Sequence, residues 1–206
     1  MRNILDQLLG GGKTLPRRAG EKYQGQRQGA LGLLLGHQKA RKYRDKVATL
    51  GGISALGKLA YSLYRDWLQQ QKVSPPTHVI PQPLHILQGN ALEIRADLLV
   101  RAMIAAARAD GHVDEVEHET ITGRLTELGF DNAAHFIGRE LMRPLDPYLL
   151  AREVTDMEQA TEVYFVSLLA IEVDHFMERG YLDELAKALR LAPELRAHIE
   201  ARVAAL

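Results

Sequence analysis

Two short acidic segments, 64 residues apart, carry the side chains of this sequence best suited to chemistry. The first contains Asp110, Asp114 and Glu117, and the second contains Asp174 and Glu178. Each follows an apolar helical stretch and spaces two carboxylates four residues apart across a break between helices. If the two helix–turn–helix units pack side by side, these five carboxylates converge. Carboxylate oxygens suit hard divalent cations, so the segments are either a cation site or two sets of helix caps.

Helix capping accounts for part of this pattern. Asp114 with Glu117 three residues later is the capping-box arrangement, and acids at a helix N-terminus also complement the helix dipole. Capping leaves Asp110, Asp174 and His175 unexplained, because they stand where helices end and carboxylates are unfavourable. That misplacement favours a bound ligand, and the capping interpretation stays open beside it.

The predicted ligands are compatible with more than one divalent cation. Calcium and magnesium suit the carboxylates, and the nearby His112 or His175 extends the choice to zinc or manganese. The first segment is not an EF-hand loop, because Gly111 is second and not sixth in it. Two carboxylates could serve as general acid and base. Because no nucleophile with its base and no phosphate-binding loop accompanies them, we expect that the protein is not an enzyme. We also expect no nucleic-acid partner.

Charge divides the chain into two halves. Residues 1–72 hold 14 Lys and Arg against 4 Asp and Glu, whereas residues 73–206 hold 12 against 22. Such asymmetry is typical of a protein that meets an anionic surface with one half, or whose halves neutralise each other. The sequence predicts four parts: a flexible glycine-rich basic region (1–36), a basic and apolar helix (37–72), a proline-rich linker (73–84) and an all-α domain (85–206).

Residues 47–64 form an apolar stretch close to the shortest length that spans a bilayer. A basic run precedes it, and Tyr61, Tyr64 and Trp67 follow in the way of an interfacial aromatic belt. Lys58 opposes insertion, although its long side chain could reach the interface. Three interpretations stay open: a single span with the N-terminus in the cytoplasm, a helix lying on anionic lipid, and a helix packed on the acidic domain.

The remaining sequence shows helical periodicity and capping signals but no strand-like alternation. It predicts an all-α bundle of about seven helices whose centre is the stretch 163–171, which is apolar on every face. Thr155 to Glu158 forms a second capping box ahead of that helix. The other expected helices span 91–109, 114–128, 131–142, a short turn from Asp146–Pro147, 180–190 and 193–204.

The first acidic segment resembles the signature turn of the tellurite-resistance TerB-like domain. The stretch from Ile171 to Leu182 resembles more closely one branch of that superfamily, a family of unknown function typified by the enterobacterial inner-membrane protein YebE. Pro144–Pro147, Glu162–Phe165, the glycine-rich N-terminal segment and the proline-rich linker fit the same branch. The resemblance thus covers nearly the whole chain.

The resemblance implies a compact all-α domain whose paired turns are associated with divalent cations. Carried over, the ligands are Asp110, Asp114, Glu117, Asp174 and Glu178, with His175 departing from the usual glycine. It also implies an inner-membrane protein of unassigned role, linked to envelope stress. We therefore expect a non-enzymatic, membrane-associated interaction module that touches lipid through residues 39–64 and binds an unknown protein partner. Homo-oligomers stay open. The alternative is a cytoplasmic or peripheral scaffold whose acidic turns are only caps.

Overall fold

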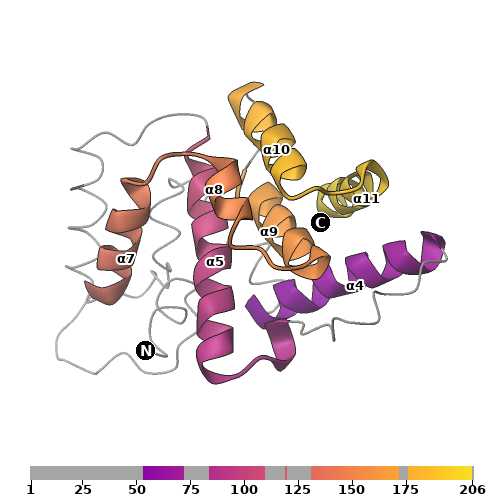
Figure 1. Cartoon of the computed structure of the whole chain (residues 1–206), viewed down its shortest axis with the longest axis horizontal. Coiled ribbons are helices and arrows are strands. Elements are labelled where there is room, and N and C mark those ends of the chain that lie inside the picture. Colours follow the sequence, from indigo (N-terminus) through magenta and orange to yellow (C-terminus); the bar gives the residue numbers. More distant parts are fainter. Residues whose placement is uncertain (1–52, 72–83, 110–118, 120–130, 172–175, 206) are drawn as a thin grey trace, which may run out of the picture.

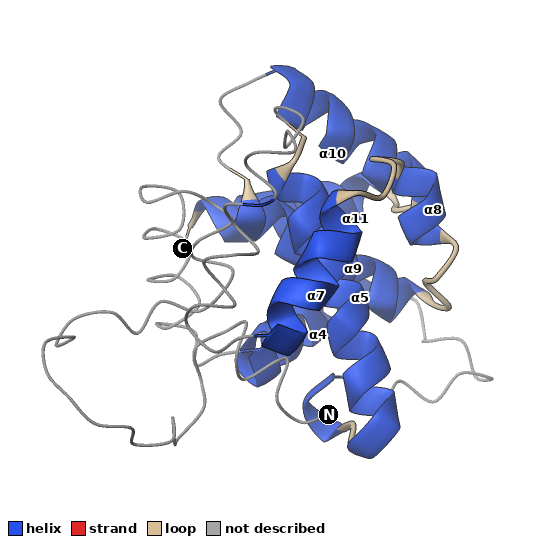
Figure 2. Cartoon of the chain, turned by 90° about the vertical axis from the view of Figure 1, so that its left-hand side faces the viewer, coloured by secondary structure: helices blue, strands red, loops and turns tan. Residues whose placement is uncertain are grey.

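The computed structural model describes residues 53–71, 84–109, 119, 131–171 and 176–205. Within these residues the chain forms helices and no β-strand (Figures 1 and 2), which confirms the all-α fold class. Their order is α4 (Ile53–Gln71), the 3₁₀ helix η1 (Leu84–Ile86), α5 (Gly89–Ala107), α7 (Asp131–Leu141), α8 (Pro147–Ala151), α9 (Met157–Ala170), α10 (Phe176–Ala188) and α11 (Pro193–Ala204).

Helix α9 is the centre of the bundle, as its apolar sequence predicts. Every residue from Ala160 to Ile171 is buried, because α4, α5, α10 and α11 all pack against this helix (Figure 1). Tyr164 and Phe165 are fully enclosed. A helix that is apolar on all sides can be stable in water only when neighbours cover all of them.

Local capping signals set the ends of α8 and α9. Asp146 accepts a hydrogen bond from the Tyr148 amide at 2.8 Å, and Pro147 occupies the first turn of α8. At α9 the expected capping box is wrong by one residue. Asp156, not Thr155, is the N-cap and accepts from the Gln159 amide at 2.8 Å. Gln159 therefore takes the place expected for Glu158, and Glu158 turns into the interior.

Helix α4 differs from the long apolar helix expected over residues 47–64. It runs on to Gln71 and is amphipathic, with Lys58, Arg65 and Asp66 exposed. Its other face buries an apolar stripe against α9 and η1: Gly57, Ala60, Leu63, Tyr64 and Leu68. Polar residues recur every three to four positions and form one solvent-exposed face, so α4 is a surface helix of the bundle.

Helices α7 and α11 agree closely with expectation, and α10 does not. The sequence predicts a helix over 180–190, whereas α10 begins at Phe176, four residues earlier. Glu178 consequently lies in its first turn. The expected helix over 114–128 lies outside the described residues except for Glu119.

Candidate functional site

The C-terminal ends of α5 and α9 lie at the same end of the bundle. Arg95 of α5 donates to Glu162 of α9 at 2.5 Å, and further along both helices the Ser167 hydroxyl donates to the Ala102 carbonyl at 3.5 Å. Because later positions of α5 meet later positions of α9, the two helices run parallel. The chain segments that follow α5 and α9 are the two predicted acidic segments, and both therefore start from one end of the bundle.

Glu178 is the predicted ligand that falls within the described part of the chain. Its side chain lies in the first turn of α10 and the residue is only 2% exposed. A carboxylate at this position complements the helix dipole. Burial of a carboxylate is costly unless polar or charged neighbours compensate it. The location suits a ligand that faces inward beneath the start of α10.

A buried arginine lies at the same end. Arg108, just after α5, donates through Nη1 to the carbonyl oxygens of Glu140 at 3.2 Å and Arg143 at 2.9 Å. It thereby closes the C-terminal end of α7, where carbonyls lack partners within the helix. Burial lowers the pKa of Arg108 and raises the pKa of Tyr181, a buried residue of α10. Tyr181 stands in the second segment where an acid matching Glu117 would be.

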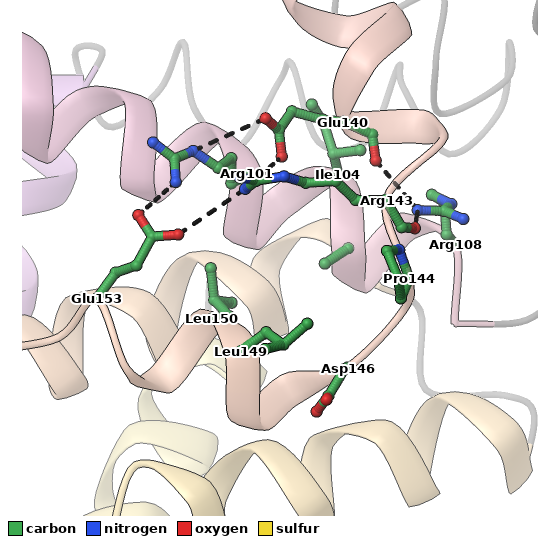
Figure 3. A pocket seen from close by; sticks show the side chains of 11 residues that line it. Arg101, Ile104, Arg108, Glu140, Arg143, Pro144, Asp146, Leu149, Leu150 and Glu153 are labelled. Carbon is green, nitrogen blue, oxygen red and sulfur yellow. Dashed lines mark hydrogen bonds and ion pairs between the residues drawn. The ribbon is translucent and has the colours of Figure 1, made fainter.

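A pocket of about 230 Å³ opens beside the C-terminal half of α5, between α7 and α8 (Figure 3). Arg101 pairs with Glu153, and its Nε lies 4.0 Å from a carboxylate oxygen of Glu140. Arg143 lies 3.2 Å from Glu140 and 3.8 Å from Glu153. The four charges thus alternate around one wall, while Ile104, Pro144, Leu149 and Leu150 supply the apolar lining. Both glutamates of this wall are held by arginines.

A second buried polar cluster occupies the start of α9. Glu162 is 1% exposed and accepts from Arg95 and, at 3.4 Å, from the Leu84 amide of η1. Glu158, one turn earlier, is 4% exposed, and neither of its carboxylate oxygens has a hydrogen-bond partner. Burial first, then the charges of Glu162 and Asp156, raise the pKa of Glu158 to about 7, with Arg95 opposing.

The structure leaves most of the predicted cation site untested. Asp110, Asp114, Glu117 and Asp174 lie outside the described residues, so the convergence of the five carboxylates stays a prediction. Across the described ranges, no three His, Asp or Glu side chains are grouped in a way that could hold a metal ion. The site residues therefore rest on the sequence, on the burial of Glu178 and on the parallel course of α5 and α9.

The predicted membrane segment can be compared with the structure over its second half. Residues 57–64 place their apolar side chains against the bundle. No helix in the described part of the chain is both long and apolar enough to cross a bilayer. The predicted lipid contact of residues 39–64 is otherwise untested.

The charged residues that the structure buries are not among the functional residues predicted from the sequence. Glu158 and Glu162 stand just before the apolar stretch 163–171 at a spacing of four, which puts both on one face of a helix. A charge inside a helix that is otherwise apolar on all faces is itself a signal of a buried pair. No comparable signal marks Arg95 or Arg108 as buried, because arginines in a helix are ordinarily exposed.

The described residues form an all-helical bundle in which the amphipathic helix α4 packs against α9 and the ends of α5 and α9 lie at one end. Residues 20–203 match the family described as "Protein of unknown function (DUF533)", and the chain belongs to that family. A relative from Yersinia enterocolitica, named "Uncharacterized protein in ampR 5'region", is 37% identical over 120 residues, which cover 58% of this chain and 86% of that protein. No solved structure matches.

Proposed function

We propose that this protein is a non-enzymatic, membrane-associated module whose TerB-like domain binds a divalent cation and thereby controls contact with a protein partner. The proposed ligands are Asp110, Asp114, Glu117, Asp174 and Glu178. The observation that carries the proposal is the parallel packing of α5 and α9, which starts both acidic segments from one end of the bundle.

The burial of Glu178 supports the same site. A carboxylate that is 2% exposed in the first turn of a helix is held in place, as a ligand must be. An all-carboxylate donor set fits a hard cation such as calcium or magnesium, and an imidazole would extend the set to zinc or manganese. The family match covers both segments. The TerB-like, YebE-like assignment is part of the proposal and rests on the resemblance in the sequence.

The non-enzymatic part of the proposal has its own support. The two glutamates of the pocket wall, Glu140 and Glu153, are engaged with Arg101 and Arg143, so ion pairing already occupies them. These ion pairs join α5, α7 and the residue Glu153 that follows α8, so the four charges link the three helices. The pocket is better suited to holding α5, α7 and α8 together than to proton transfer.

For the membrane contact we propose peripheral association through the basic run Lys39–Lys46. Its five Lys and Arg residues would be attracted to an anionic leaflet by about 1 kcal/mol each near the surface. The apolar stripe of α4 is covered by the bundle, so a span by this helix is not part of the proposal. Full-length protein should sediment with anionic vesicles and not with neutral ones, and equal sedimentation would reject this part.

Calorimetry of the full chain, after chelation, tests the cation site. A cation that binds only the folded state raises stability by about 2.7 kcal/mol at one hundred times its dissociation constant. We expect one of calcium, magnesium, zinc or manganese to raise the melting temperature, and Asp110→Asn and Asp174→Asn to abolish the rise. Glu194→Gln, which changes an exposed acid in the first turn of α11, is the matched control. If no cation raises the melting temperature, the acidic turns are helix caps and the scaffold alternative takes over.

A further inference from the structure

Helix α4 packs against α9 (Figure 1). Its residues packed against the core include Trp67, the single tryptophan of the chain. Leu63, Tyr64 and Leu68 of α4 are buried in the common core. Trp67 packs against this core and stacks on Tyr64, with ring centroids 6.1 Å apart. The α4 contact is therefore apolar along most of its length.

Glu158, in the first turn of α9, is an acidic group close enough to this face for its charge to act on Tyr64 of α4. It is 4% exposed, and neither carboxylate oxygen has a hydrogen-bond partner. Arg95, the cation whose charge acts on it, is bound to Glu162 at 2.5 Å. An ionised carboxylate without partners is among the most costly groups to bury, whereas a protonated one costs far less. The packed arrangement thus favours a neutral Glu158.

The charged groups around Glu158 act in the same direction. From α9 itself Glu162 and Asp156 repel its charge, and from α5 only Arg95 attracts it. From α4 the neighbour is Tyr64, whose pKa is raised by burial and then by the charges of Asp156 and Glu158.

The remaining neighbours of α9 do not relieve this charge. From η1 the Leu84 amide donates to Glu162. The charged residues of α11 that reach α9 are Arg196 and Glu200, and these meet Tyr164, further along the helix. Two acidic groups, Glu162 and Asp156, and one basic group, Arg95, thus act on Glu158, and none of the three belongs to α10 or α11.

We propose that α4 is a proton-controlled docking helix, which stays packed on α9 while Glu158 carries a proton and detaches when Glu158 loses it. Detachment would let water reach the carboxylate and would expose the apolar stripe of α4. The pKa of Glu158 is raised when α4 is docked, so docking is strongest below the ordinary carboxylate value and weakens as pH rises through about 7. The device needs neither a cation nor a lipid, because Glu158 lies at the opposite end of α9 from the acidic turns.

Trp67 fluorescence in the full chain tests this directly, since no other tryptophan contributes. Between pH 5 and pH 9 we expect the emission of the parent protein to shift to longer wavelength as Glu158 ionises, while far-UV circular dichroism keeps its helical signal. Glu158→Gln cannot ionise and should hold the short-wavelength emission across the range. Glu194→Gln, an exposed acid on α11, should behave as the parent does.

Three results would overturn the proposal. One is a parent emission that stays constant over the pH range. Another is a Glu158→Gln protein that shifts as the parent does. The third is loss of the helical signal at the same pH, which would mean that the whole bundle unfolds. If Glu158→Gln does not fold, Glu158→Leu replaces it, because leucine is likewise unable to ionise and suits the buried position. The same constant emission is expected of it.

Discussion

Glu158 and Glu162 lie one turn apart on the buried side of α9, yet only Glu162 has a guanidinium partner, Arg95 at 2.5 Å. One ion pair and one unpaired carboxyl thus share the space between α9 and its neighbours. The pair is a structural element of the bundle, and the unpaired group is its titratable one. Each makes a separate prediction about stability.

The buried ion pair predicts that replacements of Arg95 and Glu162 have non-additive effects on the free energy of unfolding. Arg95→Met leaves Glu162 charged and buried without its partner, and breaking a buried pair in this way costs about 3–5 kcal/mol. Arg95→Met with Glu162→Leu removes both charges and should recover most of that loss. The free energy of unfolding in urea measures both. Lys187→Ala, which breaks an exposed pair with Glu184, is the control and should cost less than about 1 kcal/mol. A double variant no more stable than Arg95→Met would contradict the buried-pair interpretation.

The unpaired carboxyl predicts a pH dependence of stability. Glu158 has its ordinary pKa of 4.5 in the unfolded chain and about 7 in the folded one, so the folded state binds the extra proton. Its stabilising contribution is complete below pH 4.5 and is lost as pH rises through about 7. The shift corresponds to about 3 kcal/mol at most.

Urea unfolding at pH 5 and pH 8 measures this contribution. The parent should lose more free energy of unfolding between the two pH values than Glu158→Gln does. Other carboxyls contribute equally to both proteins and cancel in the comparison. Identical losses in the two proteins would assign the pH dependence to other groups.

Gly57 is a close-contact position between α4 and η1. A Cβ added there would lie 2.6 Å from the Leu84 Cβ, well inside the contact distance. Gly57→Ala should therefore destabilise the protein by about 1–3 kcal/mol, as overpacking does. Gly180→Ala in α10 is the matched control, because its Cβ would meet nothing within 4 Å. That change should stabilise by about 0.5–1 kcal/mol, since alanine is the better helix former. Thermal melting distinguishes the two, and a neutral Gly57→Ala would mean that α4 is not held where the structure places it.

Two arginines that line the same pocket, Arg108 and Arg143, should contribute different amounts to the free energy of unfolding. Arg108→Met removes the donor to the carbonyls of Glu140 and Arg143 and should cost about 1–3 kcal/mol. Arg143→Ala removes an exposed ion-pair member, whose contribution should be below about 1 kcal/mol. Chemical unfolding of both variants provides the comparison. Equal costs would show that the bonds to the end of α7 contribute little.

Local signals in the sequence account for much of the fold. Asp146–Pro147 and Pro193 mark where α8 and α11 begin, and the all-apolar stretch identifies the central helix, because capping and burial depend on residues close in sequence. The cap of α9 was misplaced by one residue, since Thr155 and Asp156 are both good N-caps and only packing selects between them. With Asp156 as the N-cap, Gln159 takes the capping position and Glu158 is buried.

The contacts between helices that are distant in the sequence could not be predicted from it. The packing of α4 on α9 joins residues about a hundred positions apart, and no local pattern encodes which helix the amphipathic face will meet. The same holds for Arg95 with Glu162. All five candidate cation ligands are predicted from the sequence. The structure adds that Glu178 is buried and that α5 and α9 end on the same side of the bundle.

Direct binding of a divalent cation tests the central claim most closely. Equilibrium dialysis of the full chain against manganese, with metal content measured on both sides, should show saturable binding in the parent and in Glu194→Gln. Asp174→Asn and Asp110→Asn should each lose that binding while keeping their helical signal. The same measurement with calcium, magnesium and zinc identifies the preferred ion. Saturable binding that survives in both aspartate variants, or its absence from the parent with all four ions, would contradict a cation site at the paired acidic turns.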